Sequence, residues 1–160
     1  MKILCAIGSR GGGELVRHIL PSATALGAEL LLVHVIDLGP RHELEHLPGP
    51  LLHRGPHGGP QRTQAMDAAE TAAGQHALAE ALAVAQAGGL TAQTRLERGK
   101  PEQVIVALAR ETAADRIVIR ARQTPEHHPA LGPGSVGHTA RFVLDHAPCD
   151  VLLVRTLSAP

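Results

Sequence analysis

The chain has almost no aromatic residues: Phe142 is the single one among 160 residues, and Trp and Tyr are absent. Proteins that bind single-stranded nucleic acid stack bases on aromatic side chains. Proteins that bind duplexes carry an excess of positive charge. Lys and Arg together number 15, and so do Asp and Glu, so the chain has neither feature. The composition therefore argues against a nucleic-acid partner.

Long hydrophobic runs and abundant cysteines are also missing. A membrane-spanning helix needs about 20 apolar residues, and the apolar run at residues 3–7 is too short for a signal peptide. The two cysteines, Cys5 and Cys149, suit a reducing compartment. We therefore expect a cytoplasmic protein without direct membrane insertion. Cys5 lies inside an apolar run, where a reactive thiolate is not expected.

Apolar residues recur in a pattern that alternates between strands and helices. Continuous apolar runs are typical of parallel strands that are covered on both faces. They predict strands at residues 1–7, 30–36, 116–121 and 151–154, and an alternation of apolar with polar residues predicts another strand at 90–98. Helical periodicity predicts helices at 14–26, 102–112 and around 136–147. A composition rich in Ala, Gln and Glu predicts a long helix at 63–87. The alternation implies one α/β domain over residues 1–160, with a three-layer, open, parallel five-stranded sheet.

Proline and glycine mark the interruptions of this pattern. Pro21 should kink or interrupt the first helix because it lacks a backbone donor, and Gly74 should weaken the second. Residues 37–62 are rich in Pro, Gly and His, and we expect a long loop there that is partly disordered. Its four histidines, at 42, 46, 53 and 57, fit a solvated loop better than a metal site.

Three stretches of the chain resemble the universal stress protein family. They are residues 2–7 with the segment Ala-Glu-Leu-Leu-Leu-Val-His-Val at 28–35, residues 99–119, and the ending His-Ala-Pro-Cys-Asp-Val-Leu-Leu-Val-Arg at 146–155. They occur in the family's order and cover nearly the whole chain. The resemblance implies a Rossmann-like fold, of the adenine nucleotide alpha hydrolase-like type, with strand order 3-2-1-4-5. It also implies a homodimer formed through the edge strand from Val151 to Val154.

The resemblance places a ligand, possibly ATP or AMP, at the carboxyl ends of the first and fourth strands, where the strand order reverses. Family members that bind ATP have an acid after the first strand and a G-x2-G-x9-G-[ST] loop after the fourth. Here Gly8 and Ser9 follow the first strand, and no acid occurs before Glu14. The first two loop glycines fall on Arg120 and Gln123, which cannot cheaply adopt the backbone angles of glycine.

The third loop glycine has two possible registers. Gly134 with Ser135 reads like the family's Gly-Ser-Val, whereas counting back from Cys149 selects Gly137 with His138 in the hydroxyl position. Ser135 is expected to cap the following helix in either case. The residues expected to contact a nucleotide are Gly8, Ser9, Val35, Arg120, Arg122, Gly134, Ser135, Gly137, His138 and Thr139.

The altered loop favours a non-enzymatic stress-response or regulatory protein with weak or absent ATP binding. Arginine side chains near the loop can replace lost backbone amides as donors to an anion. The alternative is a universal stress protein that binds ATP or AMP and acts as an accessory module of a transporter. Slow ATP hydrolysis is disfavoured because no positioned acid–base pair is evident. His34, on a buried strand, is expected to be a hydrogen-bonded core residue.

Overall fold

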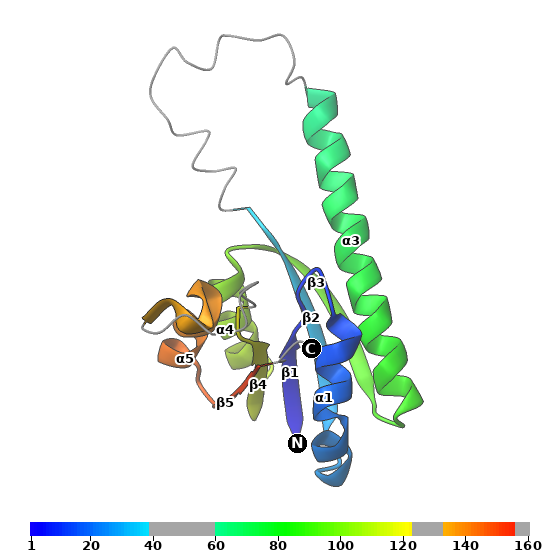
Figure 1. The fold of residues 1–160 in the computed structure, drawn as a ribbon, viewed down its shortest axis with the longest axis vertical. Helices are drawn as coiled ribbons and strands as arrows, with labels where there is room; N and C mark the ends of the chain where they lie inside the picture. Colours follow the sequence, from blue (N-terminus) through cyan, green and yellow to red (C-terminus); the bar gives the residue numbers. More distant parts are fainter. Residues whose placement is uncertain (39–59, 123–132, 156–160) are drawn as a thin grey trace, which may run out of the picture.

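The computed structural model describes residues 1–38, 60–122 and 133–155, and it folds them around one parallel sheet (Figure 1). The strands are β1 (Lys2–Ala6), β2 (Glu29–Asp37), β3 (Ala92–Gly99), β4 (Arg116–Arg120) and β5 (Asp150–Val154). The helices are α1 (Gly12–Ala25), α3 (Pro60–Ala87), α4 (Pro101–Glu111) and α5 (His138–His146), with a 3-10 turn, η2, at Pro133–Val136. The sheet order is β3-β2-β1-β4-β5, which confirms the predicted order.

Helices cover both faces of the sheet, as the continuous apolar strands predict. α1 and α3 pack on one face, and α4 and α5 pack on the other (Figure 1). Side chains of β1 alternate between the two cores: Ile3 and Cys5 belong to the α1/α3 side, and Leu4 belongs to the α4/α5 side. β1 therefore lies at the centre of the three layers, and its carboxyl end opens directly beside that of β4.

The first helix continues through Pro21, so the prediction that this proline interrupts it is wrong. Pro21 is exposed, and its ring therefore points away from the core. Leu15, Ile19 and Ala23 are buried on the opposite side and hold the helix against the sheet on both sides of the proline. Burial of this apolar stripe outweighs the lost backbone hydrogen bond. The predicted apolar residue Leu26 is the C-cap and is 49% exposed.

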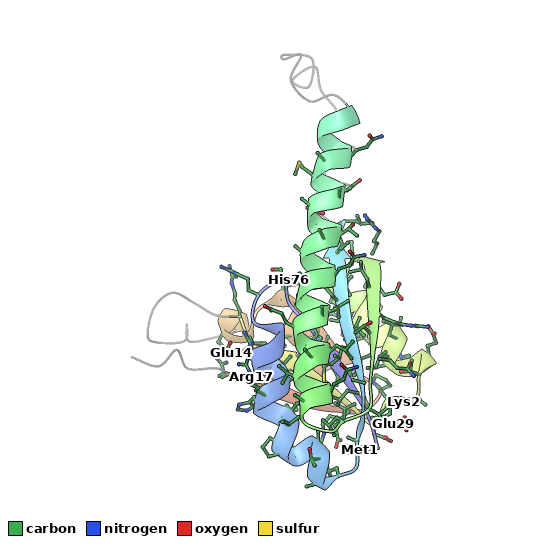
Figure 2. All side chains as sticks on the ribbon, turned by 90° about the vertical axis from the view of Figure 1, so that its right-hand side faces the viewer. Met1, Lys2, Glu14, Arg17, Glu29 and His76 are labelled. Atoms are coloured by element: carbon green, nitrogen blue, oxygen red, sulfur yellow. The ribbon has the colours of Figure 1, made fainter. Side chains whose placement is uncertain are left out.

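The long helix α3 is continuous across Gly74 and begins three residues before its predicted start. Gly74 is buried where the helix passes closest to β2 and β3. A Cβ atom at this position would lie 2.5 Å from Cδ2 of His34 and 2.9 Å from Cδ1 of Leu96. The glycine therefore permits a close approach and does not break the helix. The amino-terminal half of α3 projects past the carboxyl ends of the strands (Figures 1 and 2).

Some sequence predictions concern parts of the chain outside these ranges. Residues 39–59, with the four histidines at 42, 46, 53 and 57, lie outside the described residues, as do residues 123–132, with Gln123. No helix in the described part is long and apolar enough to cross a membrane.

We expect Gly74→Ala to destabilise the fold by about 1 kcal/mol. Overpacking of a core costs about 1–3 kcal/mol, and this exceeds the roughly 0.5–1 kcal/mol that Ala gains over Gly inside a helix. Urea unfolding followed by circular dichroism measures the difference. The same substitution in a His34→Ala background is the control, because the obstructing ring is gone and only Cδ1 of Leu96 stays close to the new Cβ, so the loss should be smaller. An equal loss in both backgrounds would contradict the packing explanation.

Candidate functional site

A cleft of about 530 Å³ lies at the carboxyl ends of the strands, where the strand order reverses between β1 and β4. This volume is within the range of small-molecule sites in proteins. The wall contains the ends of β1, β2 and β4, the first residues after β1, two residues each from α3 and α4, and one from α5. Much of it is apolar, with Val33, Val35, Ile105 and Ile119 among the lining side chains.

Half of the predicted nucleotide-binding residues line this cleft. Those that do so are Gly8, Ser9, Val35, Arg120 and Thr139. Among the predicted residues whose surroundings the structure describes, those outside the lining are Arg122, Ser135, Gly137 and His138. Gly134 lies in the η2 turn. His138 is exposed, and its Nε2 lies 3.6 Å from Oε1 of Glu102, in the first turn of α4.

Gly137, and not Ser135, stands directly before helix α5. Its φ of 87° is in the region that favours glycine, and a Cβ atom there would lie 2.9 Å from Cβ of Arg122. Ser135 belongs to η2, and the N-cap has no side-chain hydrogen bond, so the prediction that Ser135 caps the helix is wrong. The Arg122 amide donates a hydrogen bond to the carbonyl oxygen of Val136, the last residue of the 3-10 turn. The turn occupies residues 133–136, so the helix starts only after it. The geometry favours the register that places the third loop glycine at Gly137.

His34 is buried and hydrogen-bonded, which confirms the prediction for it. Its Nδ1 lies 2.8 Å from the carbonyl oxygen of Ile7, so Nδ1 carries the proton and donates. In the neutral ring, Nε2 is then the remaining acceptor. His34 also lines the cleft, which the sequence did not indicate. The Nε2 side of its ring packs against Gly74 of α3.

Arg120 reaches from the end of β4 to the loop between β1 and α1. Its Nη2 donates to the carbonyl oxygen of Gly11 at 2.9 Å and lies 3.3 Å from Oε2 of Glu14. The Arg120 side chain is 17% exposed, whereas that of Glu14 is 55% exposed. A Cβ atom on Gly11 would lie 2.7 Å from Nη1, so the guanidinium packs directly over this glycine. A cation therefore stands at the position to which the family resemblance assigns the first loop glycine.

Two carboxylates that sequence reasoning did not assign to the site also line the cleft. Glu70 comes from α3 and Asp37 from the last position of β2. No acid follows β1 directly, but α3 and β2 each contribute one to the cleft wall. Helical spacing contains a signal for Glu70, because it lies four and seven positions before the buried residues Gly74 and Ala77. The face of α3 that packs on the sheet therefore points Glu70 towards the ends of the strands.

Neither cysteine is placed as a nucleophile. Burial raises the pKa of Cys5 to about 12. Burial and the neighbouring charge of Asp150 also raise the pKa of Cys149, which is half-buried before β5. Within residues 1–38, 60–122 and 133–155, no three His, Cys, Asp or Glu side chains lie together in a way that could hold a metal ion.

Comparison with known proteins identifies the family of the chain. The model of the universal stress protein family matches residues 1–155. The chain belongs to the universal stress protein family. None of the curated proteins matches it. The universal stress protein UspA from Lactobacillus plantarum has 25% sequence identity and a TM-score of 0.71, with 97% of each chain covered. The resemblance found in the sequence is thereby confirmed.

Two solved structures of related proteins contain adenine nucleotides. A family member from Arabidopsis thaliana with AMP bound is 17% identical, with a TM-score of 0.61, and the match covers 97% of this chain and 91% of that one. A universal stress protein from Archaeoglobus fulgidus in complex with dAMP is 22% identical, with a TM-score of 0.58 and 96% of each chain covered. At these identities the likeness establishes a shared fold.

We expect iodoacetamide to modify Cys149 well before Cys5 in the native protein at pH 8.5. With a pKa of about 12, about one Cys5 thiol in a thousand is ionised even at pH 9, and the side chain is inaccessible. Peptide mass spectrometry over time separates the two sites. In guanidinium chloride both should react at similar rates, which is the control. Labelling of Cys5 as fast as that of Cys149 under native conditions would disprove its burial.

Proposed function

We propose that this universal stress protein is a non-enzymatic regulatory protein whose cleft binds an adenine nucleotide that carries a single phosphate group. The observation that carries the proposal is the 530 Å³ cleft at the reversal of the strand order, with Arg120 in place of a phosphate-loop glycine. The AMP and dAMP bound by the related proteins from Arabidopsis thaliana and Archaeoglobus fulgidus support the choice of ligand class.

The chemistry of the walls suits a nucleoside. Apolar side chains such as Val35, Ile105 and Ile119 offer a surface for the faces of a base. His34, Glu70 and Asp37 add polar side chains to the same wall, and a few polar groups in an apolar wall are typical of small-molecule sites. In this proposal these groups take over the task that the family gives to the acid after the first strand.

The preference for one phosphate follows from the donors near the end of β4. A glycine-rich loop binds several phosphates through many backbone amides. In this chain Arg120 and Gln123 replace the first two glycines of the family's loop, so fewer backbone amides can approach the ligand. A single arginine forms strong, charge-assisted hydrogen bonds with one phosphate. ATP binding should therefore be weaker than AMP binding.

A regulatory role without catalysis is the second part of the proposal. Hydrolysis needs an acid or base within hydrogen-bond reach of the reacting group. The buried His34 donates from Nδ1 to Ile7, and Arg120 is held by Gly11. Neither arrangement offers a mobile proton donor at a phosphate, and the carboxylates of Glu70 and Asp37 in the cleft wall each already have a partner. Release of phosphate from Mg-ATP above the buffer rate by the purified protein would refute this part.

We expect Ala73→Phe to weaken AMP binding at least about tenfold, or about 1.4 kcal/mol, in isothermal titration, because the ring would occupy cleft space that the ligand needs. Ala73 lines the cleft from the exposed side of α3. Ala72→Phe is the matched control: Ala72 is equally exposed and lies outside the lining. It should leave AMP affinity within about twofold. Equal effects of both substitutions, or no AMP binding by the wild type, would contradict the proposal.

A homodimer formed through β5 is the proposed assembly. β5 lies at the edge of the sheet beside β4, and Leu152 is 38% exposed on it. An exposed apolar edge is a surface for pairing with another chain.

A transporter as partner stays a prediction, which the resemblance of residues 138–149 to accessory modules of transporters suggests. The cytoplasmic location also stays a prediction. Co-purification with a membrane transporter would support the former.

We expect the wild type to elute as a dimer in size-exclusion chromatography with light scattering, and Leu152→Lys to elute as a monomer. A lysine on the pairing edge introduces charge that must be desolvated in the dimer. Leu26→Lys is the matched control, because Leu26 is also an exposed leucine, 49% accessible, at the end of α1. A monomeric wild type, or a dimeric Leu152→Lys variant, would exclude β5 as the interface.

A further inference from the structure

The pair formed by Arg120 and Glu14 is the feature in which this cleft departs furthest from a glycine-rich phosphate site. Both contacts of the guanidinium within the described part of the chain go through Nη2: to the Gly11 carbonyl at 2.9 Å and to Oε2 of Glu14 at 3.3 Å. Arg120 is the last residue of β4, and Glu14 is in the first turn of α1. The pair thus joins the end of β4 to the helix that follows its neighbouring strand β1.

The two partners differ in how firmly they are held. Arg120 is 17% exposed and packs over Gly11, so its position is fixed by backbone as well as by charge. Glu14 is 55% exposed, and its carboxylate can turn into solvent at little cost, because exposed ion pairs contribute little to stability. An incoming anion can therefore replace Glu14 without moving the arginine.

Glu14 lies at the end of the fold that carries the cleft, so an anion in the cleft can reach the place that its carboxylate occupies. Figure 2 shows Glu14 at the end of α1 that lies towards the projecting half of α3. Met1, Lys2 and Glu29 lie at the opposite end, where β1 and β2 begin. Arg120 lines the cleft itself, so the carboxylate that it holds stands at the border of the cleft.

We propose that Glu14 competes with the ligand's phosphate group for Arg120 and thereby determines which nucleotides the cleft accepts. This inference rests on the proposed binding of a nucleoside monophosphate. A phosphate dianion forms a stronger charge-assisted pair with the guanidinium than the exposed carboxylate does. Adenosine has no group for this exchange. A triphosphate brings more negative charge close to Glu14, which repels it. Glu14 is therefore a specificity-determining residue that disfavours polyphosphates.

The test is a titration of adenosine, AMP and ATP into the wild type, Glu14→Gln and Arg120→Gln. The wild type should bind AMP about tenfold more tightly than adenosine, as expected for a hydrogen bond between charged groups. Glu14→Gln should strengthen AMP binding about two- to fivefold, strengthen ATP binding by a larger factor and leave adenosine unchanged. Arg120→Gln should bring the affinity for AMP down to that for adenosine.

Glu29→Gln is the matched control, because it removes the same charge at the opposite end of the sheet (Figure 2). It should leave the ratio of AMP to adenosine affinity unchanged. Circular dichroism melting checks that each variant folds, and Glu14→Gln carries the test if Arg120→Gln does not fold.

Three results would overturn the inference. An unchanged AMP-to-adenosine ratio in Glu14→Gln would show that the carboxylate does not compete. Stronger AMP and ATP binding by Arg120→Gln would show that the arginine obstructs the phosphate site. Either result leaves the proposed nucleotide binding intact, because adenosine and AMP still bind. A failure of the wild type and of Glu14→Gln to bind either ligand would overturn the proposed function together with this inference.

Discussion

The point at which β1 leaves the sheet is fixed by the two backbone groups of Ile7. Its amide donates to the carbonyl of Val33 at 2.7 Å, and its carbonyl accepts the 2.8 Å hydrogen bond from the His34 ring. Both partners belong to β2, so the first loop residue, Gly8, starts at a defined place beside the neighbouring strand. The buried ring in turn requires Gly74 on α3, because any side chain there would meet it. The wall of the cleft between β1, β2 and α3 depends on this one contact.

The sheet could be predicted from the sequence because most of its strands are apolar runs and β3 alternates apolar with polar residues, and the strand order followed from the family resemblance. The helix ends and interruptions could not be predicted so well. Pro21 is a strong local signal against a helix, yet the buried stripe around it prevails. Ser135 is a good capping residue by itself, but a 3-10 turn and the positive φ of Gly137 shift the helix start. Tertiary packing determines both the continuity of α1 and the start of α5, and the preferences of single residues do not contain this information.

In the candidate site, too, some residues could be predicted from the sequence and others could not. The position of Arg120 was evident because it falls where the family has a glycine. Its partner Glu14 was not, because the two residues are 106 positions apart and meet only through the parallel pairing of β1 and β4. Glu70 and Asp37 were missed for the same reason: the acid was sought after β1, and the fold supplies acids from α3 and β2. A cleft at a sheet reversal collects residues from distant segments, and no local motif describes that set.

The projecting half of α3 gives the cleft a mechanical connection to the outside of the molecule. Glu70 and Ala73 line the cleft just before the buried Gly74, where the helix leaves the body of the domain. From Ala73 back to Pro60 the helix extends for about 20 Å at 1.5 Å per residue. A ligand in the cleft would therefore contact α3 at the point where its projecting half begins. A small tilt of the helix at that point would displace its amino-terminal end by a larger distance.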